Sequence, residues 1–297
     1  MLLQESRKGT VMAKGYIVYN NKAGKEQNLQ EIMHLKDMMQ TEVEMIDVAT
    51  IGSYREIVNR LEADDYLLLC GGDGTLNCFV NQTEGLDITN EILYYPNGTG
   101  NDFANDLKKE KGCEPFRIND YLKKLPTVTV KDKTYRFING VGFGIDGYCC
   151  EVGDEIKKTP GKKVDYTAIA IKGLLFYFKP VNAVITVDGK KHTYQKVWIA
   201  PTMHGRFYGG GIMPTPNQQR NNEEGMLSAM VFHRSGKLKT LMIFPSLFKG
   251  EHLKHTKYVE VLQGKDITVE FDRPCSLQVD GETILNVTSY HAVSSIG

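Results

Sequence analysis

A short apolar run that ends in a glycine-rich turn is the feature that most constrains this sequence. Residues 67–70, Leu-Leu-Leu-Cys, predict a buried strand, and the turn Gly71-Gly-Asp-Gly74 follows at once. We expect Thr75 to be the N-cap of a helix over residues 76–81. A strand that leads through glycines into a helix N-terminus presents unpaired N–H groups to an anion. The stretch therefore predicts a phosphate site, although an isolated Gly-Gly turn can also be purely structural.

The carboxylate of Asp73 limits which kind of phosphate ligand the turn could bind. It would repel a phosphate unless a cation lay between them, so Asp73 predicts Mg²⁺ bound together with a polyphosphate. We expect the backbone amides of Gly72, Gly74 and Thr75 to hold the phosphate oxygens, because glycine lets a ligand approach the backbone closely.

Apolar runs alternate with helical periodicity in the first part of the chain. Strand-like runs cover residues 15–19, 43–46, 67–70 and 92–95, and helical patterns separate them. This alternation predicts right-handed βαβ units and an open parallel sheet. Ligands of such sheets bind beyond the carboxyl ends of the strands, where the polar turns of this sequence fall.

The pattern changes after Pro126. Short β-rich runs separated by Gly, Asp and Pro turns continue to about residue 279, with helical insertions around residues 159–178 and 238–248. The chain therefore predicts an α/β domain followed by an all-β domain, a sandwich.

Several motifs together resemble one family. The second polar turn, within Tyr94-Tyr-Pro-Asn-Gly-Thr-Gly-Asn-Asp-Phe-Ala104, and the first, Leu69-Cys-Gly-Gly-Asp-Gly-Thr75, resemble the nucleotide site of the diacylglycerol kinase and sphingosine kinase superfamily of lipid kinases. Three more stretches follow the family's order: Asn20-Asn-Lys-Ala-Gly24, Asn139-Gly-Val-Gly-Phe-Gly-Ile-Asp146, and Tyr208-Gly-Gly-Gly-Ile-Met-Pro214 with Gln278-Val-Asp-Gly-Glu282. The resemblance covers nearly the whole chain.

This resemblance implies the boundaries of the two domains. Residues 12–128, joined by a returning final segment over about 283–297, would form the α/β nucleotide-binding domain. Residues 129–282 would form the β-sandwich domain that shapes the lipid site, and the active site would lie in the cleft between the two domains.

The resemblance also implies the reaction and its residues. MgATP would donate a phosphoryl group to a lipid hydroxyl, and Glu282 would accept the proton of that hydroxyl, as a carboxylate beside a bound alcohol can. Asp102 and Asp146 would join Asp73 in an acidic network around Mg²⁺. The nucleotide contacts would come from Asn20, Asn21, Lys22, Ala23, Gly72, Asp73, Gly74, Thr75 and Thr99.

Two candidate metal positions carry weaker signals. The family usually has an aspartate after the Gly-Gly-Gly loop, associated with a structural Mg²⁺, and Glu224 stands in its place here. His252 and His255 could share a helix face, but the His-Glu-x-x-His pattern is missing, so a solvated face is favoured over a metal site.

Three alternatives stay open at this point. Gly142-Phe-Gly-Ile-Asp-Gly147 has dinucleotide-fingerprint spacing, but it follows the α/β half instead of starting it. An NAD kinase shares Gly-Gly-Asp-Gly-Thr, although the Asn-Glu pair of that family is not found. A catalytically silent lipid- or nucleotide-binding regulator is the third alternative. The lipid acceptor itself is open among diacylglycerol, a sphingoid base, phosphatidylglycerol and other long-chain alcohols.

Charge and composition bound the partners. Lys+Arg and Asp+Glu are equal at 36 each, so no global field favours nucleic acid. Six cysteines without Cys-x-x-Cys spacing, and an N-terminus too polar for a signal peptide, predict a cytoplasmic protein. Lys157, Lys158, Lys162 and Lys163 precede the apolar stretch 169–178, which indicates either a core helix or peripheral contact with the inner membrane surface. A homodimer is compatible with the sequence.

Overall fold

A five-stranded sheet forms the centre of the N-terminal domain in this computed structural model, which describes residues 13–20, 26–39, 41–159 and 162–296. The strands are β1 (Lys14–Tyr19), β2 (Glu42–Asp47), β3 (Tyr66–Gly71), β4 (Glu91–Pro96) and β5 (Phe116–Arg117), in the spatial order β2-β1-β3-β4-β5. All neighbours pair in parallel except β4 and β5. This is the open parallel sheet predicted from the alternating pattern.

Helices cover both faces of this sheet. They are α1 (Glu26–Met38), the short η1 (Val48–Thr50), α2 (Tyr54–Val58), α3 (Asp73–Gln82), α4 (Asp102–Asp106) and α5 (Asn119–Leu122). Leu68 packs with Ile32 and Leu35 of α1, whereas Leu67 and Leu69 pack with residues of α2, α3 and α4 on the other face. Since β3 is buried on both faces, its sequence is a continuous apolar run.

The C-terminal domain is built on one ten-stranded antiparallel sheet. Its strands are β6 (Thr127–Val130), β7 (Lys133–Arg136), β8 (Gly140–Phe143), β9 (Val181–Val187), β10 (Lys190–Val197), β11 (Thr202–Met203), β12 (Leu227–Phe232), β13 (Val259–Gly264), β14 (Asp266–Val279) and β15 (Glu282–Val293). The order β13-β12-β11-β8-β14-β15-β6-β7 is extended by β9, which pairs with β14 and β10.

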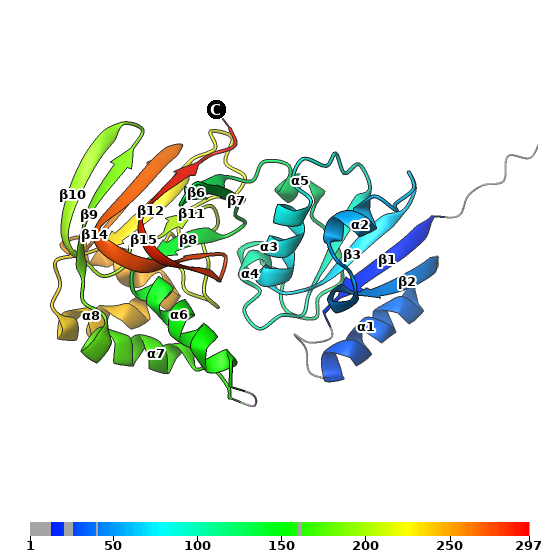
Figure 1. The fold of residues 1–297 in the computed structure, drawn as a ribbon, viewed down its shortest axis with the longest axis horizontal. Helices are drawn as coiled ribbons and strands as arrows, with labels where there is room; N and C mark the ends of the chain where they lie inside the picture. The colour runs from blue at the N-terminus through cyan, green and yellow to red at the C-terminus, as the bar shows by residue number, and fades with distance from the viewer. Residues whose placement is uncertain (1–12, 21–25, 40, 160–161, 297) are drawn as a thin grey trace, which may run out of the picture.

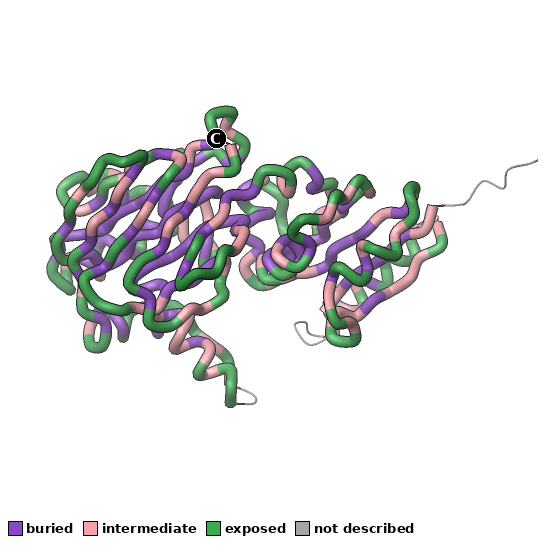
Figure 2. Tube along the Cα trace, turned by 45° about the horizontal axis from the view of Figure 1, so that its top comes forward, coloured by how far each residue is buried: buried purple, intermediate pink, exposed green. Residues whose placement is uncertain are grey.

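Bends in the long strand β14 fold this sheet over itself. Its register shifts between Glu270 and Leu277, and its two halves pair with β9 and β8 respectively. The ring of Phe143 consequently stacks on that of Phe271, with centroids 3.7 Å apart. Buried residues of β8, β9, β14 and β15 belong to one core cluster. Exposed residues lie mainly at the ends and turns of these strands (Figure 2). The predicted combination of an α/β domain and a β-rich second domain is thus confirmed.

The final segment differs from the expectation. Residues 283–297 were expected to return to the α/β domain, but β15 pairs with β14 and β6 inside the C-terminal sheet. The hairpin turn after Val279 brings the chain straight back along β14, so antiparallel pairing continues there and the segment adds a strand to the second domain. That part of the predicted domain boundary is wrong.

Helices pack along one edge of the C-terminal domain (Figure 1). They are α6 (Ile145–Lys157), α7 (Tyr166–Lys172), η2 (Gly173–Tyr177), α8 (Lys237–Ile243), η3 (Phe244–Lys249) and η4 (Glu251–Lys254). Their apolar sides share a core around the buried Trp198. No helix in the described ranges is long and apolar enough to cross a membrane.

Candidate active site between the two domains

The two glycine turns predicted to bind nucleotide lie against each other at the carboxyl ends of β3 and β4. The amide of Asn97 donates to the carbonyl of Gly71 at 3.1 Å. A Cβ atom built on Gly98 would lie 2.4 Å from the Cα atom of Gly72. Only glycine permits this approach of two backbones, which accounts for the glycines at both positions.

The start of α3 is accessible at this edge. The helix begins at Asp73 with Gly72 as its N-cap, so the predicted cap at Thr75 is wrong and Thr75 lies in the first turn. Gly74 is exposed, with no described atom within 4 Å of a Cβ atom built on it, and Thr99 of the facing turn is exposed as well. The first amides of a ten-residue helix and a hydroxyl therefore border the same accessible edge.

Asp73 is anchored by donors from both domains. Its Oδ2 atom accepts the amide of Asp102 at 2.9 Å, and its Oδ1 atom accepts the amide of Phe103 and Nδ2 of Asn139, each at 2.9 Å. The carboxylate thereby holds the N-terminus of α4 and the start of the β domain in one place.

Asp102 makes the next contact between the domains. Its two oxygens accept the amides of Gly210 and Gly211 at 2.7 and 2.8 Å. Both glycines have positive φ, at 82° and 107°, which suits the residue without a Cβ atom. Burial, and next the charge of Asp73, raise the pKa of Asp102 to about 7, against the lowering effect of the two amides. The Gly-Gly-Gly loop thus covers the carboxylate of Asp102, next to Asp73.

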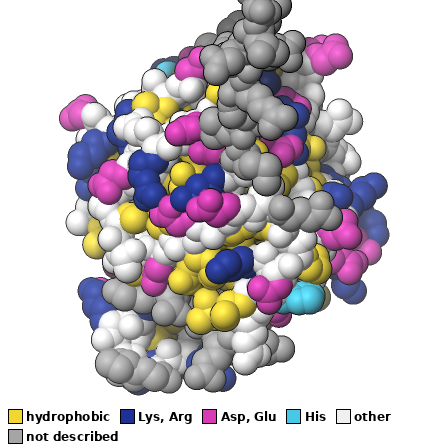
Figure 3. Space-filling model, turned by 90° about the vertical axis from the view of Figure 1, so that its right-hand side faces the viewer, with side chains coloured by type: hydrophobic (Ala, Val, Ile, Leu, Met, Phe, Trp, Pro, Cys, Tyr) yellow, Lys and Arg dark blue, Asp and Glu magenta, His cyan; other side chains and the backbone are white. Residues whose placement is uncertain are grey.

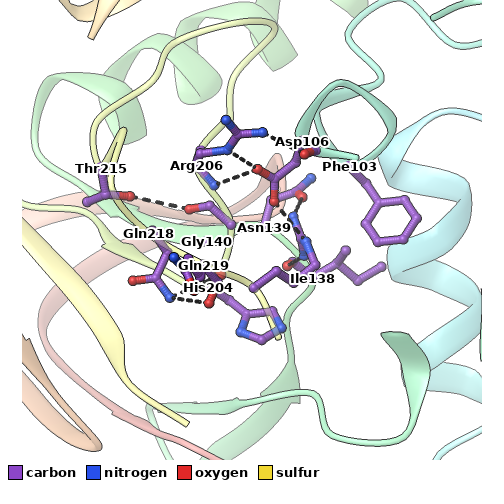
Figure 4. Close-up of polar contacts among 12 residues, drawn as sticks. Phe103, Asp106, Ile138, Asn139, Gly140, His204, Arg206, Thr215, Gln218 and Gln219 are labelled. Carbon is purple, nitrogen blue, oxygen red and sulfur yellow. Dashed lines mark hydrogen bonds and ion pairs between the residues drawn. The ribbon is translucent and has the colours of Figure 1, made fainter. Parts of the chain in front are cut away.

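A buried ion-pair network extends this contact (Figure 4). Asp106 of α4 accepts Nε of Arg206 at 2.7 Å and Nε of Arg220 at 3.0 Å. Arg220 also donates to Oδ1 of Asn139 at 2.8 Å and to the carbonyl of Ile138. Burial lowers the pKa of the Arg220 guanidinium, and the Asp106 carboxylate opposes this shift. Asn139 therefore links Asp73 to Arg220.

Asp280 is a residue of the candidate site that sequence reasoning missed. Its Oδ1 atom accepts the amides of Asn139 and Gly140, and its Oδ2 atom accepts the amide of Ile138 and Nδ2 of Asn77 of α3. It lies in the Asp-Gly turn between β14 and β15, with φ of 47°. From the sequence, a role in this turn was expected for Glu282 and none for Asp280. Burial raises the pKa of Asp280, and its four donors oppose the shift.

Asp146 and Glu282 lie in contrasting surroundings. Asp146 is buried at the start of α6, where its Oδ2 atom accepts the hydroxyl of Tyr208 at 3.0 Å and its Oδ1 atom has no hydrogen-bond partner among the described residues. Burial raises the pKa of Asp146 to about 6. Glu282 is exposed at the start of β15. Burial, and next the charge of Glu282, raise the pKa of Cys78, so this carboxylate lies near α3.

The other predicted positions are less informative. Asn20 directly follows β1 and is half-buried, whereas Asn21, Lys22 and Ala23 lie outside the described residues. Glu224 is exposed in a loop. Within the described ranges, no group of three or more His, Cys, Asp and Glu side chains is placed to hold a metal.

The predicted pair of histidines is not a solvated face. His252 is fully buried, and its Nε2 atom lies 2.7 Å from the carbonyl oxygen of Pro214. Burial lowers the pKa of this imidazole. The contact with Pro214 and the burial together indicate that His252 is a structural residue of the core.

The carboxylate oxygens near the turns fit a Mg²⁺ ion that keeps several of its waters better than one bound mainly by protein side chains. Each oxygen of Asp73 already accepts an N–H, and the two oxygens of Asp102 accept the amides of Gly210 and Gly211. Mg²⁺ usually keeps several waters and takes its remaining ligands from one or two carboxylates and from substrate phosphates. Asp73 therefore suits a metal that arrives with a nucleotide.

Comparisons with known proteins divide the chain as the structure does. Residues 14–128 match the diacylglycerol kinase catalytic domain, and residues 139–294 match the YegS C-terminal NAD kinase beta sandwich-like domain. The chain is 25% identical over 215 residues to a diacylglycerol kinase of Mycobacterium tuberculosis, covering 69% of this chain and 67% of that protein.

Solved structures agree on the fold. A crystal structure of a diacylglycerol kinase from Bacillus anthracis superposes with a TM-score of 0.60 at 17% identity and covers 96% of each chain. The second family match includes β15, in agreement with its place in the C-terminal sheet.

Proposed function

Because this chain belongs to the family that joins a diacylglycerol kinase catalytic domain to a YegS C-terminal domain, we propose that it transfers the γ-phosphoryl group of ATP to the hydroxyl of a lipid. The family resemblance predicted from the sequence is confirmed by these matches. The observation that carries the proposal is the pair of abutting glycine turns beside the open N-terminus of α3, with Asp73 anchored next to them.

The phosphate chain of ATP would lie along this edge. The amide of Gly74, in the first turn of α3, would donate to its oxygens, and the helix dipole favours the negative charge there. The amide of Thr75, also expected to hold a phosphate oxygen, already donates to the carbonyl of Gly72 at 3.0 Å. The exposed hydroxyl of Thr99 would contact the nucleotide from the facing turn. Mg²⁺ bound with ATP would neutralise charge that develops on the transferred group.

The acceptor hydroxyl needs a base on the side of the β domain. Glu282 is exposed, lies near α3, and follows directly on the turn that Asp280 ties to Asn77. We propose that it takes the proton as the lipid oxygen attacks the γ-phosphorus. The proposed acceptor is a long-chain alcohol, and diacylglycerol is the first to test because of the relatives' names.

The test is a panel of lipid acceptors with γ-labelled ATP and Mg²⁺, with NAD as a further acceptor. Label transferred to a lipid supports the proposal. Transfer to NAD alone would identify an NAD kinase instead, and no transfer to any acceptor would favour a silent binding protein.

Two variants separate the proposed roles. Thr99→Val should mainly raise the KM for ATP, because it removes a contact made in the ground and transition states alike. Glu282→Gln should mainly lower kcat, by about a hundredfold, and leave ATP affinity unchanged. If Glu282→Gln abolished ATP binding while turnover per bound enzyme held, the assignment of the proton acceptor would be wrong.

A further inference from the structure

Large exposed apolar side chains gather on two segments of the C-terminal domain. Phe176 and Tyr177 of η2 are 69% and 67% exposed, and Leu238 and Met242 of α8 are each 73% exposed. Tyr166 and Ile171 of α7, which precedes η2, and Phe248 of η3, which follows α8, are exposed as well. Single exposed apolar residues are ordinary, but a group of this size on neighbouring helices indicates an interaction surface.

These two segments form one surface. Lys237 at the start of α8 donates from Nζ to the carbonyl of Leu175 in η2 at 2.7 Å. On their inner sides, Leu174 and Ile243 belong to the same buried cluster. Figure 1 shows α7 and α8 at the same lower edge of the domain. We call residues 162–179 and 234–257 together the basic helical edge.

The charge of this edge is strongly one-sided, although the whole chain is neutral. Residues 162–179 carry four lysines against Asp165, and residues 234–257 carry one arginine and five lysines against Glu251. By contrast, the end of the molecule formed by the N-terminal domain shows positive and negative side chains side by side (Figure 3). The compensating acidic residues therefore lie elsewhere.

The lysines expected from the sequence to meet a membrane are only partly those of this edge. Lys157 and Lys158 pair with Asp154 and Glu155 one turn earlier in α6, at 3.0 and 2.5 Å. Such pairs offset the attraction to an anionic surface. Lys172 and Lys179, which flank the exposed aromatic residues, are exposed too, and α8 adds charge that the sequence reading did not connect to them.

We infer that the basic helical edge docks on an anionic lipid bilayer, with its exposed apolar side chains in the interface and its lysines at the headgroups. A bilayer surface matches this edge because it offers negative charge and an apolar interior together. An acidic protein surface would leave Phe176, Leu238 and Met242 without apolar contacts. A pocket of about 370 Å³ lined by Tyr177, Phe178 and Lys179 adjoins the edge.

The inference deepens the proposed function, since a lipid kinase must reach a substrate that lies in a bilayer. The test measures sedimentation of the protein with vesicles of phosphatidylcholine containing 30% phosphatidylglycerol. Two variants are compared with wild type: Phe176→Ser/Leu238→Ser/Met242→Ser, and Lys172→Gln/Lys179→Gln. The control is Met33→Ser/Met38→Ser, which removes side chains of similar exposure, 52% and 58%, from α1.

Docking predicts that each test variant lowers vesicle partitioning by about tenfold or more, that the control does not, and that wild-type binding weakens with salt. Turnover of a detergent-dispersed lipid should stay at the wild-type level in all variants. Unchanged partitioning of both test variants would overturn the inference. It would also be overturned if wild type were dimeric without vesicles and the triple serine variant monomeric, because the edge would then bind a second copy.

The two proposals fail in different ways. Vesicle binding without phosphoryl transfer to any lipid would refute the kinase proposal and support docking. Phosphoryl transfer without vesicle binding would support the kinase proposal and refute docking.

Discussion

Asp73 combines a structural and a proposed catalytic role in one carboxylate. It accepts three N–H donors, two from the start of α4 and one from Asn139 of the other domain. Asp73→Asn leaves a single acceptor oxygen for three donors. We therefore expect the free energy of unfolding to fall by about 1–3 kcal/mol and kcat to fall by at least about a hundredfold.

Urea denaturation and ATP turnover of the same Asp73→Asn preparation check both effects. Asp64→Asn, at an exposed position before β3, is the matched control. A variant that loses stability but keeps wild-type turnover would restrict Asp73 to its structural role.

Asp146 should make stability depend on pH. Burial raises its pKa from 3.8 to about 6, so the fold favours the protonated carboxyl. The stability it contributes is present below pH about 4 and is lost as pH rises toward 6. Asp146→Asn keeps an acceptor for Tyr208 and cannot ionise. The variant should match wild type near pH 4 and exceed it by on the order of 3 kcal/mol above pH 6.5.

Denaturation of both proteins across this pH range measures the difference in unfolding free energy. A difference that stays constant with pH would show that Asp146 does not titrate in this window.

At the scale of elements, the approach of the β3 and β4 turns is sensitive to one added atom. The Cβ atom of Gly98→Ala would meet the backbone of Gly72 at 2.4 Å, and backbone cannot rotate away as a side chain can. We expect a loss of about 1–3 kcal/mol in stability and a raised KM for ATP. Gly236→Ala, where no described atom lies within 4 Å of the added Cβ atom, should leave the KM unchanged; its stability cost should be limited to the loss of a favoured N-cap residue of α8. Equal KM values for the two variants would separate the turn from nucleotide binding.

Some elements of the fold could be predicted from the sequence and others could not. The strand at residues 67–70 and its turn were predictable because burial on both faces requires a continuous apolar run and because the close turn requires glycine. The pairing of β15 was not, since a strand's partner depends on tertiary contacts that its own pattern does not encode. Asp280 was missed for the same reason, because an Asp-Gly turn looks alike whether its carboxylate faces water or four donors.

At the scale of the whole molecule, the two domains are joined by charged groups that water does not reach. Asp106 and Arg220 are each 4% exposed, and Asn139 connects Arg220 to Asp73 at the proposed nucleotide site. Removing one partner of a buried pair leaves a charge without compensation, which costs about 3–5 kcal/mol. The relative position of the domains, and with it the distance between the proposed ATP and lipid sites, thus depends on this network.

Arg220→Met tests that dependence, because it keeps much of the apolar volume beside Phe103 and removes the bonds to Asp106, Asn139 and Ile138. We expect a loss of about 3–5 kcal/mol in stability and two unfolding transitions by calorimetry in place of one, as the domains separate. Arg206→Met is the matched comparison: its side chain is 26% exposed and bonds the same carboxylate, so water can replace it and the loss should be smaller. Equal losses in the two variants, with a single transition in both, would mean that Arg220 does not couple the domains.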